Sequence, residues 1–244
     1  MNPEEYYKLA EIEQTHWFYS GKRAIVKDWI EHYHPLKADD IFVDVGCGTG
    51  LLVEEMRPRC VAVGMEPAVD ALAINRHAGR HVIAADCGQP LPLKSNSVAV
   101  ATALDVLEHL RDDRAALSEI IRVLRPGGLA IITVPAFPFL MSDWDESLGH
   151  YRRYKLEDFP RLLQGFPVTI LEHKYINSVF FVPIMFYRLG RKILRLRGQN
   201  RMEDKIPPAV INKLMYRMFV SSACERHNRP PFGLSILLIL RKQS

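Results

Sequence analysis

Cysteine is scarce in this sequence, and its spacing excludes two kinds of site. The 244 residues include 4 cysteines, and no two of them form a CxxC pair. Zinc ribbons and redox dithiols depend on such pairs, so neither is indicated. The opening segment MNPEEYYKLA is acidic and polar, whereas a signal peptide begins basic and continues apolar. We therefore expect a protein of the reducing cytoplasm.

Long hydrophobic runs are absent as well. The longest uncharged apolar stretch in the carboxyl-terminal half, residues 175–187, contains a proline and is shorter than the roughly 20 residues of a membrane-spanning helix. Residues 126–142 are also uncharged, but glycines and prolines divide them into strand and loop. The sequence therefore predicts no membrane-spanning helix.

Neither sign of charge is in large excess. Lysine and arginine total 32 against 28 for aspartate and glutamate, a formal net charge of +4, and 48% of the residues are hydrophobic. This balance is typical of one soluble globular domain, with or without a small lobe, and excludes a disordered chain. It permits an acidic ligand or an anionic surface without requiring nucleic acid.

Short apolar runs alternate with segments of helical spacing between residues 38 and 174. Runs rich in valine, isoleucine and alanine predict buried strands at 41–45, 60–65, 81–85, 98–104, 129–134, 168–175 and 233–240. Helical patterns fall at 51–56, 68–77, 112–124 and 155–164. Strands that alternate with helices pair in parallel through right-handed crossovers. We therefore predict an α/β fold with a Rossmann-like, doubly wound sheet of seven mostly parallel strands.

Three segments do not follow this alternation: 1–37, 136–154 and 176–232. They are rich in aromatic residues, arginine and proline. Ligands of open α/β sheets bind beyond the carboxyl ends of the strands, where the first two segments are placed to reach. We interpret all three as a helical and aromatic cap or substrate lobe on a catalytic core of residues 38–175 and 233–244.

A glycine-rich turn follows the first predicted strand. The segment FVDVGCGTG places Gly46, Gly48 and Gly50 after a strand and before a helix, which lets a ligand approach the backbone closely. The third glycine comes one position earlier than in the GxGxxG pattern of dinucleotide sites. Asp44 precedes the turn, and its carboxylate suits a cationic ligand better than a pyrophosphate.

Two more acidic residues end the next two predicted strands. Glu66 is placed where an acid accepts hydrogen bonds from two ribose hydroxyls. Asp86 follows the third strand and is placed to meet an adenine amino group. Together with Asp44, these acids predict a site for a positively charged nucleoside with a free ribose.

At this point the chain resembles the class I S-adenosylmethionine-dependent methyltransferases. The matching motifs, in order, are VDVGCGTG (43–50), GMEP (64–67), ADCGQPLPL (85–93), ALDVLEHL (103–110) and RVLRPGG (122–128). The resemblance implies S-adenosylmethionine as cofactor and S-adenosylhomocysteine as product. It implies cofactor contacts from Asp44, Gly46, Cys47, Gly48, Gly50, Glu66, Pro67, Asp86, Cys87 and Leu104.

Further segments resemble an uncharacterised bacterial and archaeal subgroup that is often associated with envelope-polysaccharide and lipid-linked sugar pathways. These segments are EQTHWFYSGKR (13–23), TVPAFPFL (133–140), GHYRRY (149–154) and PPFGLS (230–235). In the first, we predict that His16 and Trp17 fold over the cofactor while Arg23 or Lys22 pairs with its methionine carboxylate. The alternative is a helix whose aromatic residues pack on the core and whose basic residues are solvated.

The candidate catalytic residues follow the fourth predicted strand. One interpretation makes His109 or His150 a general base, with Glu108 orienting it. A second is a divalent metal held by Asp105, Glu108, His109 and His150, similar to sets in some ubiquinone-type and small-RNA methyltransferases. In the third, the Glu-His pair hydrogen-bonds the backbone and packs the methionine end of the cofactor.

The acceptor is expected to meet residues of the middle segment. Arg152 and Arg153, beside Tyr151, suit an anionic acceptor, and Trp144 suits an apolar wall. The alternative is a solvated loop or ion pairs with Asp143, Asp145 or Glu146.

A basic, leucine-rich stretch covers residues 188–201. It predicts contact with an anionic membrane surface or a lipid-linked acceptor, or else an ordinary amphipathic helix with a solvated basic face. Nucleic acid is not expected, because aromatic residues do not interleave with the basic ones.

The sequence as a whole predicts a methyltransferase for a small-molecule or glycan acceptor, most readily at oxygen. Nitrogen or carbon acceptors stay open, as does a catalytically silent nucleoside-binding or scaffold protein. The oligomeric state is not predicted.

Overall fold

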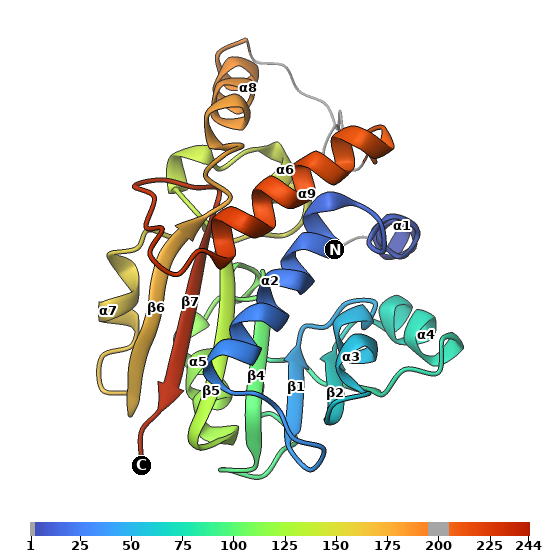
Figure 1. Ribbon diagram of the computed structural model, residues 1–244, viewed down its shortest axis with the longest axis vertical. Helices are drawn as coiled ribbons and strands as arrows, with labels where there is room; N and C mark the ends of the chain where they lie inside the picture. The colour runs from blue at the N-terminus through green and yellow to red at the C-terminus, as the bar shows by residue number, and fades with distance from the viewer. Residues whose placement is uncertain (1–2, 195–204) are drawn as a thin grey trace.

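The computed structural model describes residues 3–194 and 205–244, and its centre is a 7-stranded sheet in the order β3-β2-β1-β4-β5-β7-β6 (Figure 1). The strands are β1 Ile41–Val45, β2 Val61–Glu66, β3 Val82–Ala84, β4 Val98–Leu104, β5 Leu124–Pro135, β6 Val168–Ile176 and β7 Ser235–Lys242. Strand β7 runs antiparallel to both of its neighbours, whereas the other neighbouring pairs are parallel. The predicted fold class is confirmed.

Helices cover both faces of the sheet. They are α1 Pro3–Ile12, α2 Trp17–Tyr33, α3 Leu51–Met56, α4 Val69–His77, α5 Asp113–Val123, α6 Asp143–Ser147, α7 Asp158–Leu162, α8 Phe181–Ile193 and α9 Ala209–Cys224. Two short 3-10 turns, η1 Leu107–His109 and η2 Pro138–Leu140, follow β4 and β5. Helix α5 begins where the sequence indicates, because the Asp112 side chain accepts a hydrogen bond from the Ala115 amide at 2.9 Å.

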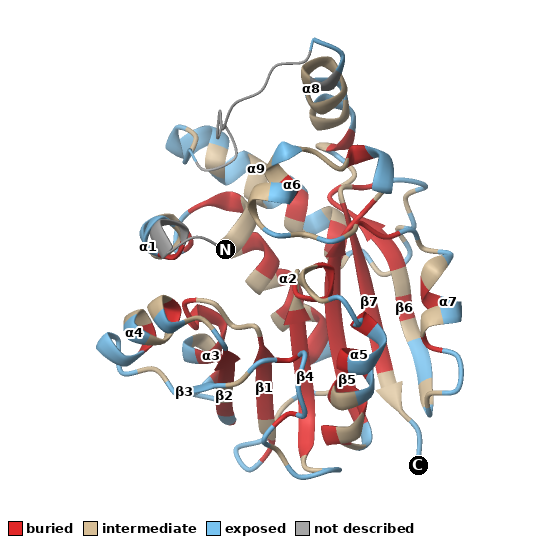
Figure 2. Cartoon of the chain, turned by 180° about the vertical axis from the view of Figure 1, so that it is seen from behind, coloured by how far each residue is buried: buried red, intermediate tan, exposed pale blue. Residues whose placement is uncertain are grey.

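The core lies in two layers, one on each face of the sheet (Figure 2). Successive strand residues alternate between the faces, so Val43 joins the cluster formed with Leu117 of α5, whereas Phe42 joins the cluster formed with Trp29 of α2. Strand β4 is buried from Val98 to Ala103. Such continuous burial is typical of a central parallel strand covered on both faces.

Part of the expected cap belongs to this core. Helix α2 packs on the sheet through Ile25, Trp29 and Ile30, and α9 packs on α2 so closely that a Cβ on Gly21 would lie 2.8 Å from Cδ1 of Phe219. The apolar residues of α2 recur at helical spacing, so one face of the helix must be buried. Helices α1, α6 and α8, by contrast, lie beyond the carboxyl ends of the parallel strands (Figure 1).

Two predicted helices are shorter than expected. The helix predicted over 155–164 is reduced to α7, because Pro160 has no amide hydrogen and is tolerated only in the first turn. The helix predicted over 112–124 ends at Val123, since Leu124 is already extended and pairs with Val98. The segment Pro126-Gly127-Gly128 therefore lies inside β5 and not in a loop.

The described helices include none long and apolar enough to cross a membrane. The predicted basic stretch begins in α8, but its residues 195–201 lie outside the described part of the chain.

Candidate functional site

The glycine turn after β1 adopts a backbone that requires glycine. Gly46, Gly48 and Gly50 have φ angles of +68°, +54° and +76°, a region that L side chains rarely adopt. A Cβ on Gly46 would lie 2.6 Å from Cγ2 of Val106, whereas a Cβ on Gly48 would meet nothing within 4 Å. At Gly46 the turn therefore packs against the loop that follows β4. At Gly48 the turn is open, and a ligand can approach the backbone there.

Asp44 lies directly before this turn and is buried. It accepts a hydrogen bond of 2.6 Å from the Thr102 hydroxyl. Burial raises the pKa of Asp44 to about 7, because the Thr102 hydrogen bond only partly opposes the loss of solvation and the Glu66 charge adds to it. A cationic ligand beside Asp44 would favour its ionised form.

Glu66, at the end of β2, binds the turn from the other side. Its Oε2 accepts from the Gly48 amide at 2.9 Å, and its Oε1 accepts from the Ala68 amide at 3.0 Å and from the Tyr6 hydroxyl at 3.3 Å. The Tyr6 bond brings α1 over the carboxylate expected to hold the ribose. Sequence reasoning missed Tyr6, which has no motif of its own.

The other predicted cofactor residues lie around the same strand ends. Asp86 is exposed and accepts from the Gly88 amide at 2.8 Å, whereas Cys87 is buried in the core. Pro67 follows β2 directly, and Leu104 is the last residue of β4. Cys47 is partly buried, and burial raises the pKa of its thiol well above the ordinary value, which makes it a poor nucleophile.

The residues after β4 form a compact cluster with a residue of the middle segment. Ligand atoms of Glu108, His109 and His150 all lie within 4.8 Å of one another. The two imidazole rings meet edge to face, with centroids 4.6 Å apart. Burial lowers the pKa of His109 to about 4, and the charge of the neighbouring His150 adds to this effect. The sequence predicted this cluster by its residue types, and the fold brings the distant His150 to it.

Glu108 is fully buried, and neither of its carboxylate oxygens has a hydrogen-bonding partner on another described residue. Burial raises its pKa well above the usual value, and the Asp105 charge adds to the effect. The interpretation in which the Glu-His pair hydrogen-bonds the backbone stays a prediction, since a backbone hydrogen bond at Gly149 partly opposes the lowering of the pKa of His109.

Asp105 turns away from this cluster. It has a φ of +56°, forms an ion pair with Lys22 of α2, and accepts from the Thr133 hydroxyl at 2.9 Å. Burial opposes ionisation, but the adjacent Lys22 ammonium outweighs it and lowers the pKa of Asp105. Asp105 is therefore separate from the metal set that the sequence suggested, and Lys22 is paired with a carboxylate of the protein.

The N-terminal signature packs mainly on the core. His16 caps α2 by accepting from the Phe18 amide at 3.3 Å, and Trp17 is buried against Phe180, with ring centroids 4.7 Å apart. Arg23 donates to Glu55 of α3 at 2.8 Å and to the Glu13 carbonyl at 2.9 Å. In the structure Arg23 forms an ion pair with Glu55, and its predicted pairing with the cofactor stays a prediction.

The two arginines expected to bind an acceptor are held by acidic residues. Arg153 is buried and donates to Asp145 at 2.5 Å through Nη2. Arg152 donates to Asp113 at 2.9 Å and to the Arg111 carbonyl at 2.7 Å. The alternative of an ion pair with Asp145 is thus realised for Arg153, because the segment folds back onto α6.

The remaining predicted acceptor residues flank this region. Tyr151 is 52% exposed and its hydroxyl accepts from Nε of Arg111 at 3.2 Å. Trp144 lies in α6 and is half-buried.

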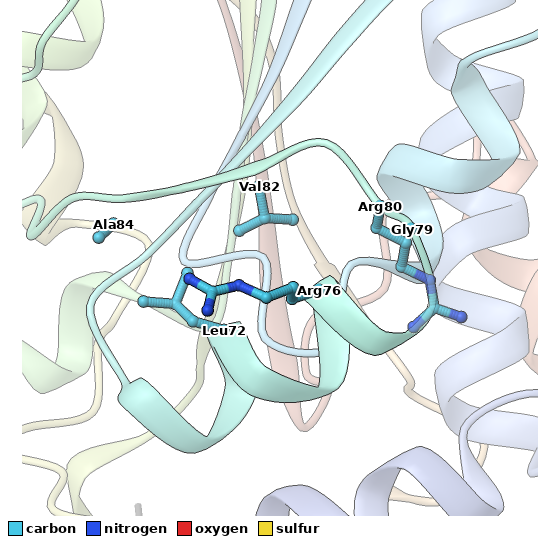
Figure 3. A pocket seen from close by; sticks show the side chains of 6 residues that line it. All are labelled: Leu72, Arg76, Gly79, Arg80, Val82 and Ala84. Carbon is cyan, nitrogen blue, oxygen red and sulfur yellow. The ribbon is translucent and has the colours of Figure 1, made fainter.

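A pocket of about 360 Å³ lies at the β3 edge of the sheet, and one of its lining residues, Arg80, contacts the glycine turn (Figure 3). Its lining residues are Leu72, Arg76, Gly79, Arg80, Val82 and Ala84. Arg80 is bound to Glu54 and to the Thr49 carbonyl, at 2.7 and 2.5 Å. The predicted site residues do not line this pocket.

Known proteins resemble this chain over the region that carries most of the motifs. Residues 43–132 match a family model described as a methyltransferase domain. A protein from Mycolicibacterium smegmatis named as a probable S-adenosylmethionine-dependent methyltransferase is 29% identical over 163 residues, 64% of this chain and 61% of that protein. A tRNA (carboxymethyluridine(34)-5-O)-methyltransferase of Arabidopsis thaliana is 30% identical over 41% of this chain and 25% of its own length. The chain thus spans less than two thirds of these curated relatives.

Solved structures share the fold across most of the chain. The geranyl diphosphate C-methyltransferase of Streptomyces coelicolor superposes with a TM-score of 0.57 at 14% identity, covering 90% of this chain and 79% of that one. At this identity the likeness concerns the fold. Residues 43–132 are thus similar to a methyltransferase domain, and the chain carries the Rossmann-like fold of solved methyltransferase structures.

Proposed function

We propose that this chain transfers the methyl group of S-adenosylmethionine to an oxygen atom of a small-molecule or glycan acceptor. The observation that carries the proposal is the close packing of two loops, in which a Cβ on Gly46 would lie 2.6 Å from Cγ2 of Val106. Glu108 and His109 follow Val106 in the chain. The expected cofactor site therefore adjoins the cluster of proton-accepting side chains.

The cofactor side fits a cationic nucleoside. Asp44 is a buried carboxylate that a nearby cation would stabilise, and Gly48 leaves space above the turn. Glu66 would accept from the ribose hydroxyls, with Asp86 near the adenine. Bound S-adenosylmethionine would supply a methyl group already activated on a sulfonium.

The acceptor side must align a nucleophile and exclude water. A hydroxyl acceptor must also lose its proton, and the imidazoles of His109 and His150 and the carboxylate of Glu108 are groups that can accept it. An oxygen acceptor agrees with the name of the Arabidopsis relative, which is a 5-O-methyltransferase. Since Arg152 and Arg153 are held by Asp113 and Asp145, the proposal does not require an anionic acceptor.

A lipid-linked acceptor is favoured by the exposed apolar residues of α8 and α9. Phe186 is 66% exposed and Val210 is 83% exposed, and neither helix contains an aspartate or glutamate. Helix α8 and the amino-terminal end of α9 lie beyond the carboxyl ends of the parallel strands, where the acceptor would enter (Figure 1). Such helices can meet an anionic membrane surface through apolar and basic side chains.

Calorimetry with S-adenosylmethionine tests the first half of the proposal. We expect saturable binding that Asp44→Asn and Glu66→Gln weaken, while Asp39→Asn, an exposed acid before β1, leaves it unchanged. Absence of binding would overturn the cofactor assignment.

Formation of S-adenosylhomocysteine with candidate acceptors tests the second half. We expect turnover with a hydroxylated glycan or polyprenyl-linked sugar. Binding of the cofactor without turnover on any acceptor would favour a silent nucleoside-binding protein, and methylation of tRNA in the same assay would contradict the small acceptor.

A further inference from the structure

Three potential metal ligands converge from two distant segments. Glu108 and His109 belong to η1 after β4, whereas His150 follows α6. The chain is drawn together there by a hydrogen bond of 2.8 Å from the Tyr151 amide to the Glu108 carbonyl. One ligand atom from each of the three side chains lies within 4.8 Å of the others, close enough to share one ion.

Glu108 is the clearest sign that this cluster binds a cation. Its side chain has no exposed surface, and neither carboxylate oxygen has a partner on another described residue. An unpaired carboxylate buried in this way is costly, and burial is normally offset by hydrogen bonds, an ion pair or a metal. The ammonium of Lys22, whose charge acts on Glu108 from α2, is already paired with Asp105.

His150 is held as a metal-ligating histidine usually is. Nδ1 of His150 faces Oδ1 of Asp145 at 3.2 Å, which leaves Nε2 for an ion. Asp145 is itself fixed by Arg153 and by the Ser142 hydroxyl, at 2.5 and 2.8 Å. Ligating histidines commonly donate their second ring nitrogen to a carboxylate, which fixes the ring and strengthens the ligand.

We propose that Glu108, His109 and His150 bind one divalent first-row transition-metal cation, such as Zn²⁺, Mn²⁺ or Fe²⁺. Two imidazoles and one carboxylate suit these ions better than Mg²⁺ or Ca²⁺, which prefer all-oxygen sites. Asp105 is outside the set, because Lys22 and Thr133 hold its two oxygens. Three protein ligands leave coordination positions open.

The role of the ion rests on the proposed methyl transfer. An open position beside the cofactor turn would hold the acceptor oxygen and lower the pKa of its hydroxyl, whose proton would pass to solvent water because the three side chains are bound to the ion. The acceptor oxygen would then form its bond to the methyl carbon as the methyl–sulfur bond of S-adenosylmethionine breaks, with S-adenosylhomocysteine as the leaving group. No change of oxidation state is involved.

Co²⁺ alone is the probe, because its visible absorption reports coordination by nitrogen and oxygen whether or not the protein is active. The full chain is stripped of metal and titrated. We expect one equivalent to bind, and His109→Ala and His150→Ala each to weaken binding at least about tenfold. His77→Ala, which removes an exposed histidine at the end of α4, is the matched control and should bind as the parent does.

Glu108→Gln separates a ligand from a merely structural residue. It keeps the shape of the side chain and removes the cost of burying an ionisable carboxyl group, so the metal-free variant should melt at the same or a higher temperature while its Co²⁺ affinity falls. Unchanged affinity in the two histidine variants, or no binding by the parent, would overturn the proposal. Calorimetry with S-adenosylmethionine on the same samples distinguishes the two failures. If the cofactor binds but Co²⁺ does not, the metal site is wrong and the proposed cofactor binding stands.

Discussion

The hydroxyl of Tyr6 donates a hydrogen bond of 3.3 Å to Oε1 of Glu66, so that α1 covers the carboxylate expected to bind the cofactor ribose. The same oxygen also accepts from the Ala68 amide, at 3.0 Å. A carboxylate oxygen has about two lone-pair directions. A ribose hydroxyl that donates to Oε1 must therefore replace Tyr6.

Replacing Tyr6 tests this competition. Tyr6→Phe removes the hydroxyl and keeps the ring, so the ribose no longer displaces a protein hydrogen bond, and S-adenosylmethionine should bind about threefold more tightly, a gain of about 0.6 kcal/mol. Calorimetry measures the affinity. Tyr7→Phe is the control, because Tyr7 is 52% exposed on the same helix and should have no effect. Weaker binding in Tyr6→Phe would mean that the hydroxyl contacts the cofactor directly.

Much of this site was predictable because it depends on local sequence. Asp44 and Glu66 lie at the carboxyl ends of two strands, and parallel strands bring their carboxyl ends to one edge of the sheet. Tyr6 was not predictable, since its contact with Glu66 joins residues 60 positions apart and α1 carries no motif. Asp105 was grouped with Glu108 by spacing, but its φ of +56° turns its side chain toward Lys22.

The sheet was predicted more accurately than the helices around it. Runs such as β4 are apolar without interruption and can hardly be anything but central strands. The aromatic content of 1–37 suggested a cap, but composition does not say which face of α2 is buried. For Arg153 the sequence offered both an anionic acceptor and an ion pair with Asp145, and composition alone does not decide between them.

Gly48→Ala should separate cofactor binding from backbone strain. An alanine at φ +54° is strained by roughly 1 kcal/mol, but its Cβ meets no protein atom within 4 Å. The methyl group would occupy space expected for the cofactor, so the affinity for S-adenosylmethionine should fall at least about tenfold, or about 1.4 kcal/mol.

Gly79→Ala is the matched control for Gly48→Ala. Gly79 has a φ of +66° and also leaves its Cβ position free within 4 Å, but it lies after α4. Thermal unfolding should show similar losses in both variants, and calorimetry should show weaker cofactor binding only in Gly48→Ala. Equal cofactor affinities would argue that the open side of the turn is not the binding face.

Lys22→Met should destabilise the protein by about 2 kcal/mol, because it leaves the partly buried Asp105 without its cation. Lys27→Met is the comparison, since Lys27 lies on the same helix and pairs with Glu55 at a more exposed site, with 33% of its side chain accessible. We expect it to lose about 0.5 kcal/mol. Denaturant unfolding measures the free energy of unfolding of both variants. Equal losses would mean that burial does not make the Lys22–Asp105 pair more important for stability than the exposed pair.

Cofactor affinity should depend on pH through Asp44. Its pKa in the folded protein is about 7, above the value for an exposed aspartate, so the ligand-free fold loses stability as the pH rises through about 7 and Asp44 ionises. A cationic cofactor needs the ionised form. Its affinity should therefore increase about tenfold between about pH 6 and about pH 8. Asp44→Asn cannot ionise, so it should bind weakly and without this increase. If the parent and Asp44→Asn show the same pH profile in calorimetry, the ionisation of Asp44 is not coupled to cofactor binding.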